Sequence, residues 1–218
     1  MYFEAAIFDL DGTLLDSMYA WERINNSFLE KRNLVVPDSY MNDICHRSLI
    51  EAAQYTIDLF NLNEEVEDII EEWNESALVE YSNNVKIFEP AMEYIIKLKS
   101  MGVKLAIATG LSKELYLPCL KNNNVLELFD VLCSTDEVSY RKEHPDIFKL
   151  VSVKTGVDPE KCIVFDDILP AIKSAKKIGM QVCGVYDKYS EKNQNEIKSI
   201  ADMYILDFNS APLPYKGV

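Results

Sequence analysis

Two aspartates near the N-terminus are the residues of this chain whose types and spacing best fit a chemical role. Residues 5–13 read Ala-Ala-Ile-Phe-Asp-Leu-Asp-Gly-Thr, so an apolar run ends at Asp9 and a second carboxylate, Asp11, follows two positions later. Residues i and i+2 of an extended segment share a face, which lets both carboxylates converge on one small site. Close carboxylates repel each other unless a cation or a proton lies between them. The pair therefore predicts a metal site in which one Asp is a nucleophile and the other transfers protons, against the plainer alternative of an acidic turn.

Three later segments carry polar side chains directly after predicted strands. Thr109 and Gly110 offer a hydroxyl beside a backbone N–H, which suits a small anion-binding turn but is also common turn chemistry. Lys142 would neutralise a transferring phosphoryl group if it lay near the carboxylates, and would otherwise be a solvated surface lysine. Asp166 and Asp167 are adjacent acids after an apolar run, and oxygen-only ligands suit a hard ion such as Mg²⁺. Because each segment follows a predicted parallel strand, we expect all of them to open onto one crevice.

The elements that must position these residues alternate between strands and helices. From residue 86 onward, short apolar runs alternate with amphipathic helices, which is typical of a parallel sheet covered on both faces. A first strand at 4–9 belongs to the same sheet, so we predict an α/β fold with a Rossmann-like parallel core. The later strands are predicted at 103–108, 129–134, 162–165, 181–185 and 203–206, with helices near 90–100, 112–123, 144–155, 169–178 and 191–200.

The stretch 16–82 has a different pattern and separates the first strand from the rest of the sheet. Apolar residues such as Trp21 and Phe28 recur at helical spacing. Further helices are predicted near 39–47, 49–61 and 64–81. We therefore predict a catalytic core of residues 1–15 and 83–218 and an inserted all-helical cap of residues 16–82. Such a cap would lie over the strand ends as a lid that excludes water and contributes specificity, whereas the alternative is that the stretch extends the core.

Composition narrows the classes of partner. The 218 residues carry 36 acids against 22 bases, a formal net charge of −14, which argues against nucleic acid as a partner. No 18-residue apolar run and no secretory leader pattern occur, so we expect no membrane partner and a cytoplasmic location. The five cysteines are dispersed, and those at 133, 162 and 183 lie in strand-like runs, which predicts reduced, buried thiols. No feature of the pattern predicts the oligomeric state.

The chain resembles the haloacid dehalogenase superfamily of phosphotransferases, whose four motifs are matched in order by Asp9-Leu10-Asp11-Gly12-Thr13, Thr109, Lys142 and Asp166-Asp167. The resemblance covers essentially the whole chain. The helical insertion is similar to the cap of the β-phosphoglucomutase-like and phosphoglycolate-phosphatase-like branch of that superfamily. The resemblance therefore implies both the fold and the class of chemistry.

Each matched residue acquires an expected role from this resemblance. Asp9 would attack phosphorus and form an aspartyl-phosphate, which water then hydrolyses. Asp11 would protonate the leaving oxygen and later activate that water. The hydroxyl of Thr109, the amide of Gly110 and the ammonium of Lys142 would bind the phosphoryl oxygens.

The resemblance also implies a ligand set for Mg²⁺. The ion would be held by Asp9, the backbone carbonyl of Asp11 and Asp167, with Asp166 bound directly or through water. Little covalent chemistry is then required of the protein, because positioning and charge stabilisation of the transferring group supply most of the catalysis.

The carboxylate of Asp11 favours an oxygen leaving group, because members of the family that cleave carbon–halogen or carbon–phosphorus bonds typically lack an acid at this position. We expect a Mg²⁺-dependent phosphatase that hydrolyses a small phosphorylated metabolite, such as a sugar phosphate. A β-phosphoglucomutase-like phosphomutase is the alternative, and it would need a second phosphate site in the cap, for which Arg47 and His46 are candidates. A catalytically silent binding protein and a receiver-like regulatory domain are non-enzymatic alternatives. Receivers carry their lysine after the acids, whereas here Lys142 precedes Asp166.

Overall fold

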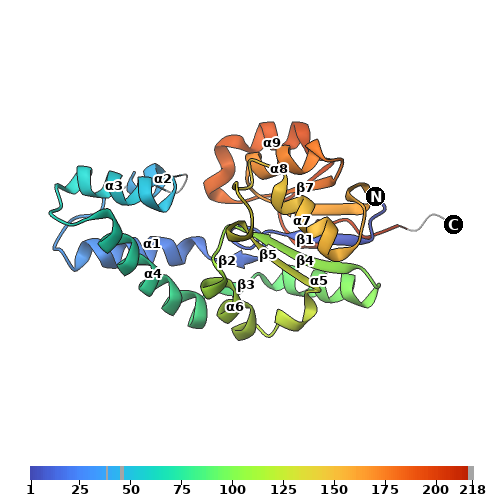
Figure 1. Cartoon of the computed structure of the whole chain (residues 1–218), viewed down its shortest axis with the longest axis horizontal. Helices are drawn as coiled ribbons and strands as arrows, with labels where there is room; N and C mark the ends of the chain where they lie inside the picture. The colour runs from blue at the N-terminus through green and yellow to red at the C-terminus, as the bar shows by residue number, and fades with distance from the viewer. Residues whose placement is uncertain (38, 45–46, 216–218) are drawn as a thin grey trace. The chain divides into compact units, whose positions relative to one another are not determined.

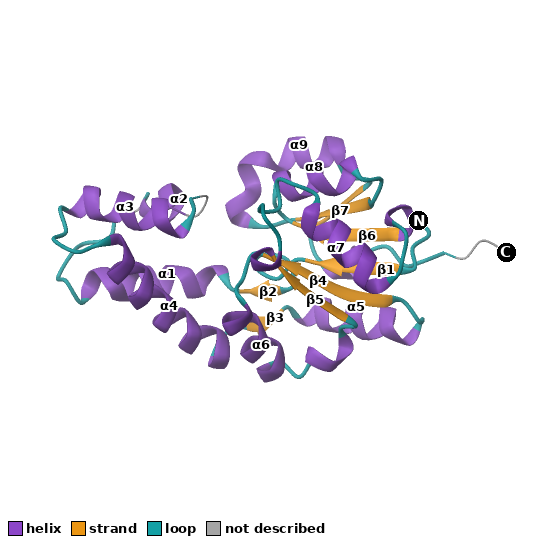
Figure 2. Cartoon of the chain, viewed as in Figure 1, coloured by secondary structure: helices purple, strands orange, loops and turns teal. Residues whose placement is uncertain are grey.

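Six parallel strands form the central sheet of the protein in the computed structural model (Figures 1 and 2). The structure describes residues 1–37, 39–44 and 47–215. The order of the strands across the sheet is β5-β4-β1-β6-β7-β8, so β1 has a neighbour on each side. The strands are β1 Ala5–Phe8, β4 Lys104–Thr109, β5 Val131–Ser134, β6 Cys162–Asp166, β7 Gln181–Val185 and β8 Met203–Ile205. The predicted α/β fold with a parallel core is confirmed.

Helices cover both faces of this sheet. Helices α7, α8 and α9 lie on one face and α5 on the other (Figure 1). The helices of this part are α5 Glu89–Ser100, α6 Lys113–Asn122, α7 Asp146–Thr155, α8 Leu169–Lys177 and α9 Gln194–Ile200. Because helices cover both faces, the central strands are apolar along most of their length, which explains why their sequence runs are continuous rather than alternating.

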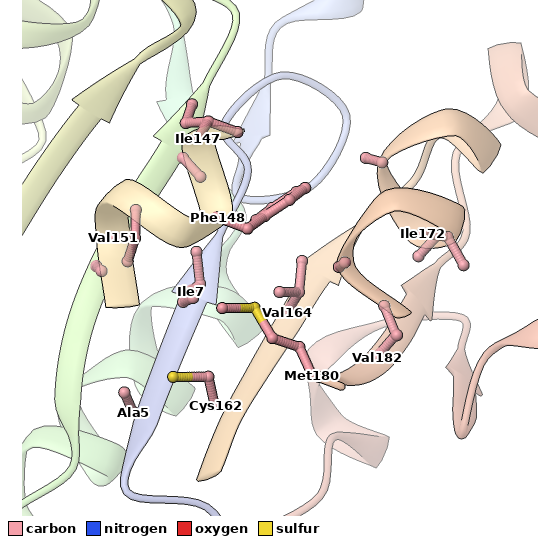
Figure 3. Packing of buried hydrophobic residues seen from close by; sticks show 14 of the residues in the cluster. Ala5, Ile7, Ile147, Phe148, Val151, Cys162, Val164, Ile172, Met180 and Val182 are labelled. Carbon is pink, nitrogen blue, oxygen red and sulfur yellow. The ribbon is translucent and has the colours of Figure 1, made fainter. Parts of the chain in front are cut away.

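Strand β1 shows how the two faces are filled. Ala5 and Ile7 point to the face of α7 and α8, and they belong to the same buried cluster as Phe148 of α7 (Figure 3). Phe8 points to the opposite face, where its ring stacks on that of Phe165 with 4.9 Å between centroids and meets the ring of Tyr94 of α5 edge-on. Successive side chains of a strand alternate between the two faces of the sheet, so the four buried residues of β1 pack against the helices on both faces.

Local sequence sets the ends of α7. Pro145 precedes the helix and Asp146 occupies its first turn, where an acid is favourable near the positive end of the helix dipole. Lys154 lies in the last turn, and Gly156 follows in a left-handed conformation with φ of 67°. This helix therefore begins where the sequence predicts, and its N-terminus fixes the end of the loop that carries Lys142.

Three details differ from the sequence-based predictions. Thr109 is the last residue of β4 rather than the first after it. The predicted helix at 191–200 is a 3-10 helix, η4 Lys188–Asn193, followed by α9. A two-stranded antiparallel ribbon of β2 Leu15–Asp16 and β3 Lys86–Ile87 was not predicted, because two-residue strands have no readable periodicity. The other 3-10 helices are η1 Leu126–Leu128, η2 Thr135–Glu137, η3 Pro159–Lys161 and η5 Phe208–Ser210.

The chain divides into two compact units, Met1–Asp16 with Lys86–Val218, and Ser17–Val85. The second unit is helical, and its elements are α1 Met18–Glu30, α2 Tyr40–Ile44, α3 Leu49–Phe60 and α4 Val66–Asn83. Its interior contains Phe28 of α1 and Trp73 of α4 in edge-on contact, 5.6 Å between ring centroids. A reciprocal capping box between Ser48 and Glu51 starts α3, and Asn61 ends it with φ of 52°.

The cysteines at 119, 133, 162 and 183 are buried and unpaired, which agrees with the predicted reduced thiols, whereas Cys45 lies outside the described residues. Burial raises the pKa of the Cys162 thiol to about 12, so this group is an inert apolar side chain. Within the described ranges, no helix is both long and apolar enough to cross a membrane.

Candidate active site

The buried acids meet at the carboxyl ends of two neighbouring strands. β1 and β6 are parallel with Phe8 opposite Phe165, so Asp9 and Asp166 leave the sheet side by side. Asp9, Asp166 and Asp167 each place one carboxylate oxygen within 4.8 Å of the others. Their exposed fractions are only 7%, 0% and 5%. The structure therefore brings together three of the carboxylates that the sequence singles out.

Lys142 enters this cluster from the loop before α7. Its ammonium Nζ lies 2.6 Å from Oδ1 of Asp9 and 2.9 Å from Oδ2 of Asp166, and the side chain is 5% exposed. The hydroxyl of Ser174 on α8 donates to the backbone carbonyl of Lys142 at 2.5 Å and anchors the loop. Burial alone would lower the pKa of Lys142, but the negative charges of Asp166 and Asp9 outweigh it and raise that pKa. The side chain is therefore a fixed positive charge beside Asp9.

Charge in the cluster is unbalanced. Three carboxylates face one ammonium, so the ionised cluster carries three negative charges against one positive. Burial raises the pKa of Asp166 to about 6 despite the opposing effect of Lys142. Burial and the negative charges of Asp166 and Asp9 raise the pKa of Asp167 well above its usual range. A divalent cation would restore balance, and a set of oxygen ligands alone suits a hard ion. The donor set therefore fits a metal ion.

The two acids after β6 are held in different ways. Both oxygens of Asp166 accept hydrogen bonds, Oδ2 from Lys142 and Oδ1 from the backbone N–H of Ile168 at 3.0 Å. Asp167 instead accepts a hydroxyl at each oxygen, from Thr13 at 3.2 Å and from Ser190 at 2.7 Å. The sequence gives no indication of Ser190, because it lies 23 residues beyond Asp167 in η4, a segment without a motif.

Asp11 lies in a tight loop rather than in the acidic cluster. The N–H groups of Leu14 and Leu15 both donate to the carbonyl of Leu10, which turns the chain back directly after β1. The turn requires Gly12, whose φ is +72°. The Asp11 side chain is partly exposed and is not among the three clustered carboxylates. This position suits a group that meets a substrate more than one whose carboxylate holds a metal.

Thr109 and Gly110 lie at the same end of the sheet, on the other side of β1. Ile107 of β4 pairs with Phe8, which places Thr109 near the residues that follow β1. The buried Thr109 hydroxyl accepts the N–H of Leu111 at 3.1 Å and keeps its own proton to donate. Gly110 is exposed, and a Cβ there would meet no atom within 4 Å. The structure thus gives no steric reason for glycine at this position.

Of the two cap candidates, Arg47 is described and His46 lies outside the described residues. The guanidinium of Arg47 lies over the ring of Tyr55, 4.6 Å from its centroid, and its Nε donates to the backbone carbonyl of Asp43 at 2.8 Å. The other bases of the helical unit, Arg23, Lys31 and Arg32, each form an ion pair with a glutamate. Arg47 itself is exposed, and it forms no ion pair with any residue that the structure describes.

Comparison with known proteins agrees with this geometry. A profile of the haloacid dehalogenase-like hydrolases matches residues 6–185. A phosphorylated carbohydrates phosphatase of Thermotoga maritima is 30% identical over 189 residues, 82% of each chain. Validoxylamine A 7′-phosphate phosphatase of Streptomyces hygroscopicus subsp. limoneus is 26% identical over 219 residues, 99% of each chain. The crystal structure of β-phosphoglucomutase from Clostridium difficile has the same fold, with a TM-score of 0.74 and 22% identity over 96% of this chain and 93% of that one.

Proposed function

The chain belongs to the haloacid dehalogenase-like hydrolase family, and we propose that it is a Mg²⁺-dependent phosphatase acting on a small phosphorylated metabolite. The observation that carries the proposal is the meeting of Asp9, Asp166 and Asp167 around Lys142 at the ends of β1 and β6. Family membership confirms the resemblance found in the motifs. The roles of the individual residues are part of the proposal.

Asp9 is assigned the role of nucleophile. Lys142 holds its Oδ1, and among the described residues no side chain bonds to Oδ2. Oδ2 would attack phosphorus, so that a bond forms between Asp9 and the phosphoryl group while the ester bond to the leaving oxygen breaks. Lys142, the Thr109 hydroxyl and the Gly110 N–H would bind the phosphoryl oxygens, whose charge they offset.

Asp11 is assigned both proton transfers. In the first step its carboxylic acid would give a proton to the leaving oxygen, which departs as an alcohol. In the second step its carboxylate would take a proton from water as that water attacks phosphorus. Inorganic phosphate then leaves and the carboxylate of Asp9 is restored. Partial exposure of Asp11 agrees with a group that serves the leaving oxygen and then water.

Asp9 and Asp167, with the backbone carbonyl of Asp11, would hold Mg²⁺. When bound, the ion supplies positive charge that offsets the clustered carboxylates and the transferring phosphoryl group. Asp166 would bind the ion directly or through water, and the hydrogen bond that its Oδ2 accepts from Lys142 would hold that ammonium beside Asp9.

A sugar phosphate is the substrate class that we favour. The name of one relative described above supports it, since that name refers to phosphorylated carbohydrates. We assign the helical unit Ser17–Val85 the role of the cap that selects the leaving group. Location in the cytoplasm and the absence of nucleic-acid and membrane partners remain part of the same proposal.

A phosphomutase is the second candidate, and Arg47 is the observation that favours it. A mutase must hold a second phosphate, and Arg47 is exposed without an ion pair among the described residues, stacked on Tyr55. Arginine stacked in this way presents its remaining N–H groups for bidentate phosphate binding. Product analysis separates the two candidates, because a phosphatase releases inorganic phosphate and a mutase returns an isomeric sugar phosphate.

The experiment that tests the proposed function is hydrolysis of p-nitrophenyl phosphate and of a panel of sugar phosphates by the purified protein. We expect release of inorganic phosphate that requires Mg²⁺ and that is abolished in Asp9→Asn. The matched control is Asp136→Asn, which neutralises an exposed aspartate outside the cluster and should leave turnover unchanged. Absence of Mg²⁺-dependent turnover by the wild type would refute the proposal.

A further inference from the structure

The loop after β7 delivers a hydroxyl to the acidic cluster. Oδ1 of Asp187 accepts the N–H of Tyr189 at 2.8 Å, and the Asp187 carbonyl accepts the N–H of Ser190 at 3.2 Å, so the chain turns into η4 at this point. The hydroxyl of Ser190 then donates to Oδ2 of Asp167 at 2.7 Å. Ser190 is 7% exposed and Asp167 is 5% exposed, so water has little access to either group.

Three segments pack closely around Asp167. A Cβ on Gly12 would lie 3.3 Å from the carboxyl carbon of Asp167 and 3.2 Å from that of Asp187. The loop after β1, the acid after β6 and the loop after β7 therefore approach one another so closely at Gly12 that no room is left for a larger side chain. From the first of these loops, Thr13 donates to the other oxygen of Asp167 at 3.2 Å. Asp167 is thus held at both oxygens by hydroxyls from two different segments, the loop after β1 and η4.

We propose that Ser190 is a positioning residue of the metal centre, whose hydroxyl, together with that of Thr13, fixes the plane of the Asp167 carboxylate. The inference rests on the proposed function, because it requires Asp167 to be a metal ligand. Each carboxylate oxygen has two lone pairs, so one accepted hydroxyl per oxygen leaves one lone pair for a cation. A carboxylate already held in place loses less freedom when the ion binds, and hydrogen-bond partners of ligands typically change metal affinity about 10–100-fold.

A merely structural role for Ser190 makes a different prediction. If the hydroxyl only satisfies a buried acid, its removal lowers the stability of the protein and leaves the affinity for the ion unchanged. Metal affinity and stability must therefore be measured separately.

The test compares three variants by calorimetric titration of metal-free protein with Mg²⁺, and by thermal unfolding without the ion. Ser190→Ala removes the hydroxyl, and Ser190→Cys keeps the size of the side chain but provides a much weaker donor. Ser152→Ala is the matched control, because the Ser152 hydroxyl also donates at 2.7 Å but to the backbone carbonyl of Val157. We expect Ser190→Ala to raise the dissociation constant of Mg²⁺ at least about tenfold. Ser190→Cys should raise it less, and Ser152→Ala should leave it unchanged.

The outcomes separate the inference from the proposed function. If the wild type binds Mg²⁺ and Ser190→Ala binds it equally well, the positioning role is refuted while the phosphatase proposal stands. If the wild type binds no Mg²⁺, both are refuted. If Ser190→Ala does not fold, Ser190→Cys decides, since an unchanged dissociation constant in that variant also refutes the positioning role.

Discussion

Replacing Lys142 by methionine should destabilise the core far more than breaking an ion pair of equal length at the surface. The Lys142 ammonium is 2.6 Å from Asp9, and the Lys154 ammonium is likewise 2.6 Å from Glu137. The first pair is 5% and 9% exposed, whereas the second is 37% and 40% exposed. Removing one partner of a buried pair typically costs about 3–5 kcal/mol, because an unpaired charge remains in a poorly hydrated site. An exposed pair contributes at most about 1 kcal/mol.

The effect of Lys142→Met should also depend on pH. The pKa of Asp166 is already raised to about 6 with the ammonium in place, and it rises further without that positive charge. A carboxyl whose pKa is raised by folding binds more protons in the folded state than in the unfolded state, so its contribution to stability improves as pH falls. The destabilisation by Lys142→Met should therefore shrink between pH 7 and pH 5. Adding Asp166→Asn should recover part of the loss, since it removes one of the unpaired charges.

Urea unfolding of metal-free protein, followed by far-UV circular dichroism, measures these effects, with Lys154→Met as the control. Both tryptophans, Trp21 and Trp73, lie in the helical unit, so their fluorescence reports that unit separately. We expect the free energy of unfolding of Lys142→Met to fall by about 3–5 kcal/mol at pH 7. A loss no larger than that of Lys154→Met would refute the view that the acidic cluster is buried and charged.

Three further predictions concern other parts of the chain. Asp11→Asn should lower kcat for p-nitrophenyl phosphate roughly 10²–10⁴-fold, and near-normal turnover would refute its acid–base role. Gly12→Ala should reduce turnover, because the new Cβ would lie only 3.2–3.3 Å from the carboxyl carbons of Asp187 and Asp167. The control is Gly102→Ala, where φ is +79° and a Cβ would meet no atom within 4 Å. This variant should lower the free energy of unfolding by about 1–2 kcal/mol and keep full activity. Arg32→Met should remove the acid sensitivity that Glu64 gives the helical unit. The hydrogen bond from Arg32 lowers the pKa of Glu64, so the stabilisation that this pair provides is present above about pH 4.5 and lost below it. The melting temperature of the helical unit, followed by tryptophan fluorescence, should therefore differ less between pH 7 and pH 3.5 in the variant than in the wild type.

Much of the core and of its acidic site follows from the sequence. The apolar runs predict the strands because the central strands are buried on both faces, and parallel strands bring their carboxyl ends to one edge of the sheet. Asp9 and Asp166 therefore converge once their strands are neighbours. That β1 pairs with β6 is a property of the three-dimensional arrangement, which periodicity along the chain does not reveal.

The remaining features depend on long-range packing that leaves no local pattern. The hydrogen bond from Ser174 of α8 anchors the loop of the buried Lys142, and no hydrophobic periodicity around residue 142 distinguishes it from a surface lysine. Ser190 reaches Asp167 only because the loop after β7 turns at Asp187. The ribbon of β2 and β3 escaped prediction because strands of two residues give no alternation.

The central claim is that Asp9 carries the phosphoryl group during the reaction, and trapping that group tests it most directly. The wild type is quenched in acid during turnover of p-nitrophenyl phosphate with Mg²⁺, and the denatured protein is treated with borohydride, which reduces an aspartyl-phosphate to homoserine. Peptide mass spectrometry should then find homoserine at position 9 and at no other aspartate. Turnover without this product, or with homoserine at another position, would contradict the account.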